Sequence, residues 1–237
     1  VLVLKGGRGR AGTRAAASHT ASLAGGVEVW ETVVSQAGGV LAEDLDELID
    51  LAASFYFLPP ITGRRVGVAG GAGGSSVLAA DECEKSGLDV IPLPVELRRE
   101  LKDKGVAIWD WIGNPADLSI RVDEDFTPGY MLETMARYPQ FDFLVPIMRR
   151  PGRRDQKGMP VETYLKQYEL KECSRKPLLA VLADRGYGTD DDDESWKREL
   201  VDSIKAELIA SHIPFYPTIG RAARAANKLI SYYEKRR

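Results

Sequence analysis

The sequence predicts an α/β protein with doubly wound, mostly parallel sheets. Short apolar runs that suit buried strands recur along its 237 residues, and helical periodicities fill the stretches between them. Strands that alternate with helices in this way form a parallel sheet covered on both faces. We expect strands at residues 1–4, 65–69, 143–147, 178–182 and 213–216. We expect helices near residues 19–37, 43–57, 74–86, 124–138, 161–173, 194–211 and 219–235.

Paired prolines mark the best candidate for a linker. Pro59 and Pro60 end a helix and fix an extended connection before the next strand. We therefore divide the chain into a first segment, 1–58, a linker, 59–64, and a complete α/β domain, 65–237. The first segment supplies two strands and two helices, fewer than a stable doubly wound sheet has. Because the chain also begins without methionine, directly on an apolar run, we interpret this segment as part of a domain in a larger protein.

The composition is that of an ordinary soluble globular protein, with 44% hydrophobic and 28% charged residues. Cys83 and Cys173 lie far apart without metal-ligand spacing, which argues against a zinc site or a disulfide framework and fits a reducing compartment. No apolar run approaches the roughly 20 residues that cross a bilayer, and the opening run is too short for a signal peptide. We expect a cytoplasmic protein.

Charge is distributed unevenly. The net charge of -3 gives no general attraction to nucleic acid. Five acidic residues occupy positions 190–194, which we interpret as an exposed loop leading into a helix N-terminus, with a metal site as the alternative. Local groups of arginine suit phosphate-bearing small molecules or solvated loops. These groups are Arg8, Arg10 and Arg14, and Arg149, Arg150, Arg153 and Arg154.

A loop that contains a histidine follows the first expected strand. Residues 5–26 read KGGRGRAGTRAAASHTASLAGG and hold His19, one of the two histidines in the chain. A histidine among small residues between a strand and a helix is poor packing material but well suited to carrying a reactive group, so His19 is the candidate nucleophile. The alternative is a structural histidine at a helix cap, because Ser18 and Thr20 are cap formers.

A glycine-rich turn follows the expected strand at 65–69. Residues 66–76 read VGVAGGAGGSS and lead into a helix, whose unpaired N–H groups and positive dipole end suit a phosphate group. The spacing fits neither a dinucleotide-binding turn nor a P-loop. A tight turn with a purely structural role is the alternative. The candidate phosphate-binding residues are Gly70, Gly71, Gly73, Gly74, Ser75 and Ser76, the serines adding hydroxyl donors.

A third motif, GNPADL, spans residues 113–118 after an aromatic stretch. Its local interpretation is an Asn-Pro turn in which Asp117 bonds its own backbone. The functional alternative is a loop whose Asn114 and Asp117 support a site elsewhere, and this needs context that the motif alone does not supply.

That context comes from the three motifs together. AAASHTASLAG, AGGAGGSSVLAADECEKSGL and GNPADL, in this order and at these separations, resemble the NDP-forming acyl-CoA synthetases of the succinyl-CoA synthetase superfamily. The resemblance covers most of residues 1–150 and implies a flavodoxin-like or Rossmann-like fold, with one partial and one complete domain of the succinyl-CoA ligase type. It matches Ser18-His19-Thr20 to a family motif whose histidine is phosphorylated, with Ala21 in place of the usual glycine.

The resemblance also implies a reaction and its participants. In this family an acyl-CoA and phosphate give an acyl phosphate, the histidine takes the phosphoryl group, and an NDP accepts it. CoA and ATP/ADP or GTP/GDP are then substrates, with Mg²⁺ accompanying the nucleotide. A CoA-binding domain and an ATP-grasp domain or subunit are the implied partners in an oligomer, and the chain itself supplies no metal site.

Two rival functions stay open at this point. The first is a noncatalytic regulatory or assembly module derived from the same family, because Ala21 departs from the motif. The second is a flavin-binding or nucleotide-binding flavodoxin-like protein, suggested by the fold alone.

Overall fold

The computed structural model describes residues 1–20, 26–71, 73–118, 126–151, 156–173, 175–182 and 195–236, except the side chains of residues 19 and 20. The chain divides into two compact units, Val1–Tyr56 and Phe57–Arg237. The division proposed from sequence, with a linker at 59–64, stays a prediction about the domains of the whole protein. Among the described residues, no helix is long and apolar enough to span a membrane.

The first unit is built on a pair of short parallel strands. Strand β1 (Leu2–Leu4) pairs with β2 (Val40–Ala42), with Leu2 opposite Val40. Helices α1 (Arg10–Thr20) and α2 (Val27–Gln36) lie between these strands in the sequence, and α3 (Leu45–Phe57) follows β2. A crossover between parallel strands needs a dozen or more residues, which the segment with α1 and α2 supplies.

Two predictions for this unit are wrong. The single helix expected at 19–37 is two helices, because α1 ends at Thr20 and α2 begins at Val27. Half of the expected loop at 5–26 is helix α1, whose described side chains are largely exposed. Its sequence contains a run of alanines, the residue with the highest helix propensity, so the helix forms with little burial of apolar surface. The first segment was expected to supply two strands, but no range was predicted for the second, which is β2.

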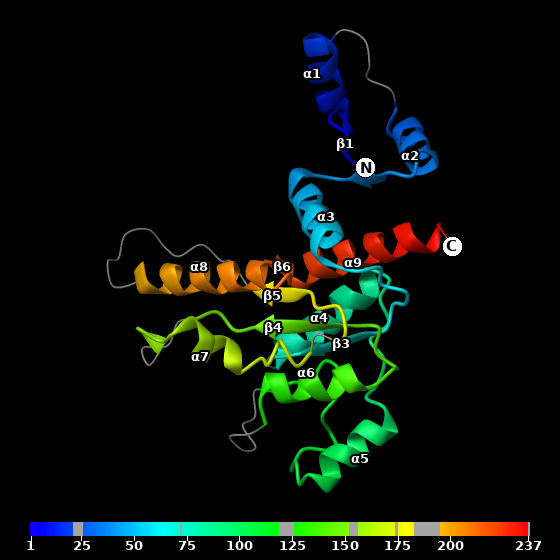
Figure 1. The fold of residues 1–237 in the computed structure, drawn as a ribbon. Coiled ribbons are helices and arrows are strands. Elements are labelled where there is room, and N and C mark those ends of the chain that lie inside the picture. Colours follow the sequence, from blue (N-terminus) through cyan, green and yellow to red (C-terminus); the bar gives the residue numbers. More distant parts are fainter. Residues whose placement is uncertain are drawn as a thin grey trace. The chain divides into compact units, whose positions relative to one another are not determined.

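The second unit contains a four-stranded parallel sheet (Figure 1). Its strands, in spatial order, are β3 (Val66–Ala69), β4 (Phe143–Met148), β5 (Ala180–Leu182) and β6 (Phe215–Tyr216). An isolated parallel bridge between Arg65 and Asp89 adds a segment on the free side of β3. With that segment the chain order across the sheet is 2-1-3-4-5, the flavodoxin-like arrangement, which confirms the predicted fold class.

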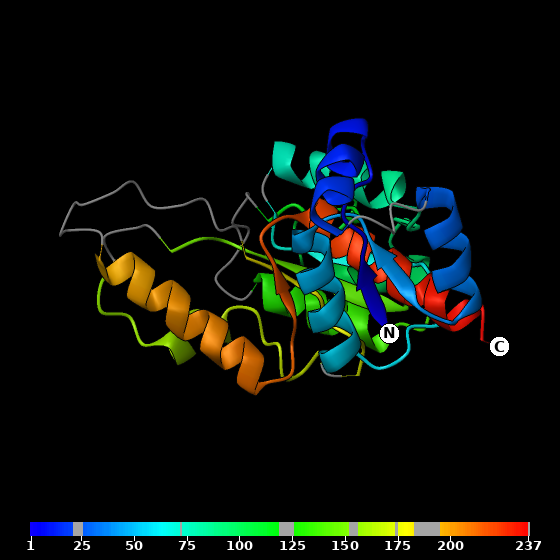
Figure 2. The same cartoon turned by 90° about the horizontal axis from the view of Figure 1, so that it is seen from above.

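Helices cover both faces of this sheet. Helix α6 (Pro128–Arg137) contacts β3 and β4, whereas α9 (Ile219–Glu234) contacts β5 and β6 and packs on α4 (Gly74–Lys85). Figure 1 shows α6 and α9 on opposite sides of the strands, and in the view from above α9 (red) lies over them (Figure 2). The remaining helices of the unit are α5 (Val95–Asp103), α7 (Val161–Lys166) and α8 (Ser195–Ala210).

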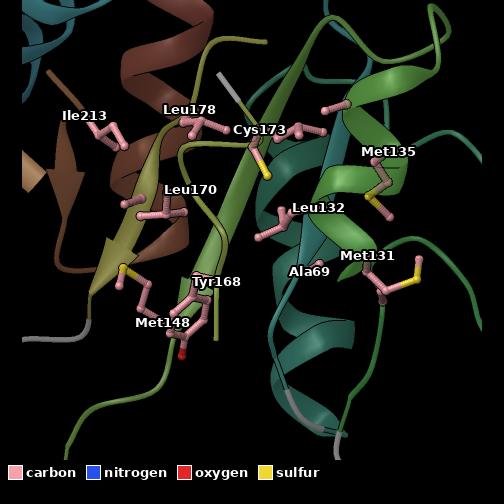
Figure 3. Close-up of a cluster of buried hydrophobic side chains, with 14 of the residues drawn as sticks. Ala69, Met131, Leu132, Met135, Met148, Tyr168, Leu170, Cys173, Leu178 and Ile213 are labelled. Carbon is pink, nitrogen blue, oxygen red and sulfur yellow. The ribbon is translucent and has the colours of Figure 1, made fainter. Parts of the chain in front are cut away.

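The main core lies on the α6 side of the sheet. Leu144 and Met148 of β4 face it, as alternation along a strand requires, and Met131 and Met135 of α6 pack there (Figure 3). Tyr168, Leu170 and Cys173 complete the cluster from the turns that follow α7. The helix predicted at 161–173 therefore ends early, at Lys166. Helix α5 was not expected; its Leu97 and Leu101 are buried at helical spacing.

Candidate functional site: the glycine-rich turn

The glycine-rich turn connects β3 to α4 at the carboxyl edge of the sheet. Gly70 has φ +107, and a Cβ there would lie 2.3 Å from the backbone oxygen of Ile147. Only glycine fits this position, because both the dihedral angle and the contact with β4 exclude a side chain. Gly73, the N-cap of α4, has φ +44 and lies open to solvent. Residue 72 lies outside the described residues.

A buried hydroxyl lies inside the first turn of α4. Ser76 is 5% exposed, and its Oγ has no hydrogen-bond partner among the described residues. A Cβ built on Gly71 would lie 2.8 Å from this oxygen and 3.3 Å from the Oγ of Ser75, so both hydroxyls lie close to Gly71. A buried hydroxyl without a partner costs free energy, typically about 1–3 kcal/mol, and its presence at a helix N-terminus points to a ligand that supplies the missing bond.

The Asn114 side chain holds the free side of β3. Its Oδ1 accepts a hydrogen bond from the Val68 N–H at 2.9 Å. Its Nδ2 donates to the carbonyl oxygens of Val66 at 2.8 Å and of Ile91 at 2.9 Å. The carboxamide thus takes the place of a peptide group beside the strand. The peptide bond from Asn114 to Pro115 is cis.

The residues after Asn114 follow β3 to the glycine-rich turn. The Ala116 N–H donates to the Val68 carbonyl oxygen at 2.8 Å, and the Leu118 N–H donates to Gly71 at 3.3 Å. Between them, Oδ2 of Asp117 accepts from the Gly73 N–H at 2.9 Å. The GNPADL motif and the glycine-rich turn, some 40 residues apart in the sequence, therefore form one structure. This carboxylate contact reaches a distant segment, whereas the local interpretation had Asp117 bond its own backbone.

His19 lies in a different place from the one expected. Its backbone is in the last turn of α1, not in a loop or at the start of a helix. The side chains of His19 and Thr20, and residues 21–25, lie outside the described part of the chain. Ser18, the other member of the motif, donates from its Oγ to the Arg14 carbonyl oxygen one turn earlier at 3.1 Å.

Other predicted features make contacts of their own or lie outside the described residues. The Arg149 N–H, just after β4, donates to the Tyr168 hydroxyl at 2.7 Å. His212 has φ +57 at the C-terminal end of α8 and packs edge-on against Phe57, which indicates a structural role. The acidic run at 190–194, with residues 153 and 154, lies outside the described ranges. Within those ranges no group of three acidic, histidine or cysteine residues could hold a metal ion.

Cys83, the cysteine on α4, has an unreactive thiol. Burial raises the pKa of the Cys83 thiol to about 12, and the charges of Glu82 and Glu84 add to this effect. The thiolate is the reactive form of cysteine, so Cys83 offers no nucleophile near neutral pH. The chemistry of this region rests on backbone N–H groups, the serine hydroxyls and a carboxylate.

The second unit has a flavodoxin-like α/β fold with a glycine-rich turn at a helix start, and comparisons with known proteins indicate what it is similar to. A family model described as the succinyl-CoA ligase like flavodoxin domain matches residues 1–55, nearly all of the first unit. Longer matches, over 62% to 99% of the chain, agree with the relationship indicated by the motifs: the chain is related to the NDP-forming acyl-CoA synthetases.

Three relatives carry this conclusion. An alpha subunit of an ADP-forming acetate–CoA ligase II from Pyrococcus furiosus is 35% identical over 149 residues, 62% of this chain and 32% of the relative. The alpha subunit of ligase I from the same organism is 27% identical over 232 residues, 98% of this chain and 46% of the relative. A solved acetyl-coenzyme A synthetase 1 of Candidatus Korarchaeum cryptofilum, in complex with phosphate and ADP, is 26% identical with a TM-score of 0.73. That match covers 99% of this chain and 47% of the solved chain, so the chain spans half or less of the length of each of these relatives.

Proposed function

We propose that the chain is part of an NDP-forming acyl-CoA synthetase, which interconverts acyl-CoA, NDP and phosphate with a carboxylic acid, CoA and NTP. The similarity to an ADP-forming ligase subunit along 98% of the chain supports this activity. The observation that carries it within the structure is the start of α4, where a buried hydroxyl with no partner among the described residues lies beside a glycine-rich turn. Such a site suits the phosphoryl group on which this reaction depends.

The residues of the turn would neutralise the phosphoryl group. Phosphoryl transfer depends mainly on positioning and on stabilising negative charge, and helix N-termini supply both. In this proposal the backbone of Gly70, Gly71, Gly73 and Gly74 approaches the phosphate closely, and the hydroxyl of Ser76, which has no partner among the described residues, donates a hydrogen bond to it. Asn114 holds β3, and Asp117 holds the turn, as supporting residues.

His19 would carry the phosphoryl group between the two half-reactions. A neutral imidazole nitrogen attacks the phosphorus of the acyl phosphate, an N–P bond forms, and the P–O bond to the acyl group breaks with release of the carboxylate. An oxygen of the NDP then attacks the same phosphorus and leaves the imidazole free. Ser18 and Thr20 flank the histidine and are proposed to support its position.

The other participants lie in portions that the chain does not supply. A CoA-binding domain and an ATP-grasp domain or subunit are the proposed partners, with CoA and ATP/ADP or GTP/GDP as substrates. The described residues offer no ligand set for Mg²⁺, so we assign none to it here. A cytoplasmic location and an oligomeric state remain predictions.

The test uses the full-length protein with its partner domains or subunit. Incubation with γ-labelled ATP should give phosphate on the protein that is stable in base and labile in acid, and His19→Asn should abolish it. His212→Asn changes the other histidine of the chain and should leave the labelling intact. Undiminished labelling of His19→Asn would remove His19 from the role. Binding of CoA and ADP without acyl-CoA-dependent ATP formation would favour the noncatalytic module instead.

A further inference from the structure

A carboxylate of the protein already lies at the start of α4. Oδ2 of Asp117 accepts a hydrogen bond from the N–H of Gly73, the N-cap residue, at 2.9 Å. This is the helix end at which unpaired N–H groups and the dipole attract anions. Helix α4 has 12 residues, long enough for a developed dipole at its N-terminus. Asp117 therefore lies where the phosphoryl group of the proposed reaction would bind.

The carboxylate is held in this place by the backbone on both sides of it. Ala116 bonds to β3 and Leu118 bonds to Gly71, so the chain cannot shift Asp117 without breaking sheet contacts. Asn114 fixes the start of the same segment with three hydrogen bonds. The contact with Gly73 is thus imposed by the fold and is not the chance position of a loose surface side chain.

The site still has a donor that Asp117 leaves unused. Ser76 Oγ is buried close to Gly71 and has no hydrogen-bond partner in the part of the chain that the structure describes. An incoming phosphate would gain this hydroxyl, but it would do so beside a fixed negative charge. Attraction by the helix start and repulsion by Asp117 would both act on the same ligand.

We infer that Asp117 is a positioning residue that keeps the turn folded without ligand and limits by charge repulsion how tightly a phosphoryl group is held at the start of α4. This inference rests on the proposed function. A group that must leave on every turnover is poorly served by very tight binding, because interactions equally strong in the bound ground state do not speed the transfer. The fixed carboxylate weakens the ground-state complex and so favours departure of the phosphoryl group.

The test compares two variants, each of which replaces one aspartate with asparagine and so removes one negative charge. Asp117→Asn keeps an oxygen that can accept from Gly73 and removes the charge. Asp81→Asn removes an exposed charge from the middle of α4 and is the control. Repulsion between two unit charges about 4 Å apart corresponds, even at the dielectric constant of water, to about a fivefold change in a binding constant. We expect Asp117→Asn in the full-length enzyme to bind inorganic phosphate at least about fivefold more tightly, with lower KM for phosphate and lower kcat.

A series of salt concentrations distinguishes charge repulsion by Asp117 from a purely structural role of this residue in the turn. The difference between wild type and Asp117→Asn should shrink as NaCl is raised from about 0.05 M to about 0.5 M, because screening weakens repulsion. The inference would be overturned if Asp117→Asn bound phosphate no more tightly than wild type, or if Asp81→Asn tightened binding as much as Asp117→Asn. In either case an active wild-type enzyme would leave the proposed function standing. A wild-type enzyme that neither binds phosphate nor turns over would overturn both.

Discussion

We expect the carboxamide of Asn114 to contribute strongly to the stability of the second unit. Its three hydrogen bonds reach Val66, Val68 and Ile91, and both valines are fully buried. Asn114→Ala leaves a backbone donor and two backbone acceptors without their side-chain partner. Each bond contributes about 1 kcal/mol net, so we expect the free energy of unfolding of this unit to fall by about 3 kcal/mol.

Urea denaturation followed by tryptophan fluorescence measures this change, because Trp109 and Trp111 precede the motif. The control is Asn227→Ala, which removes the chain's other asparagine, a partner of Arg64. It should cost about 1 kcal/mol or less because it removes the bond to Arg64, whereas Asn114→Ala removes three bonds. Amide hydrogen exchange gives a direct readout, since the Val68 N–H should lose protection in Asn114→Ala.

A second variant tests the donor half of the interaction. Asn114→Asp keeps an acceptor for the Val68 N–H but turns a carboxylate oxygen toward the carbonyls of Val66 and Ile91. Protonation of the introduced carboxyl relieves its repulsion with these carbonyl oxygens, so this variant should be more destabilised at about pH 7 than at about pH 4. A cost for Asn114→Ala no larger than that for Asn227→Ala, with Val68 still protected, would refute the reasoning.

Three further predictions follow from the second unit. Gly70→Ala should destabilise it by more than about 2 kcal/mol in the same urea assay, because its Cβ would lie 2.3 Å from a backbone oxygen at φ +107; a cost under about 1 kcal/mol would contradict this. Burial raises the pKa of the Cys83 and Cys173 thiols to about 12, so iodoacetamide at about pH 8 should label both only after unfolding, and intact mass would expose native labelling as the contrary result. Burial alone would raise the pKa of Asp142, but hydrogen bonds from Arg65 outweigh it and lower the pKa overall. The ionised Asp142 therefore contributes to the free energy of unfolding above its unfolded pKa of about 3.9, and this contribution is lost as the pH falls through the folded pKa. Asp142→Asn should lower the free energy of unfolding by roughly 1 kcal/mol at about pH 7, and the difference from wild type should narrow below about pH 4.

Local sequence was sufficient for much of the second unit. Strands β3 and β4 and helices α4, α8 and α9 lie within a few residues of the predicted ranges, because each has a strong apolar pattern with clear turn or cap residues. Thr218, for example, caps α9 by accepting from the Arg221 N–H. The glycine-rich turn could also be located, since glycine marks positions that other residues cannot occupy.

The errors have identifiable physical causes. Helix α1 was missed because the glycines before it suggested a loop, whereas its own alanines determine the conformation. Strand β2 has only three residues, Val40–Ala42, and forms because β1 pairs with it. Helix α5 was missed although Leu97 and Leu101 are spaced four residues apart, a signal too short to stand out from neighbouring prolines.

The sequence by itself determined the alternation of strands and helices, the position of the glycine-rich turn and the relationship to acyl-CoA synthetases, because these depend on residues close together in the chain. Only the tertiary structure decided what GNPADL does. Its local interpretation was a turn bonded to itself, yet Asn114 bonds to β3 and Asp117 bonds to Gly73, 44 residues earlier. The partners of a polar side chain are set by which backbone groups the sheet leaves unpaired beside it, and that depends on the packing of distant segments.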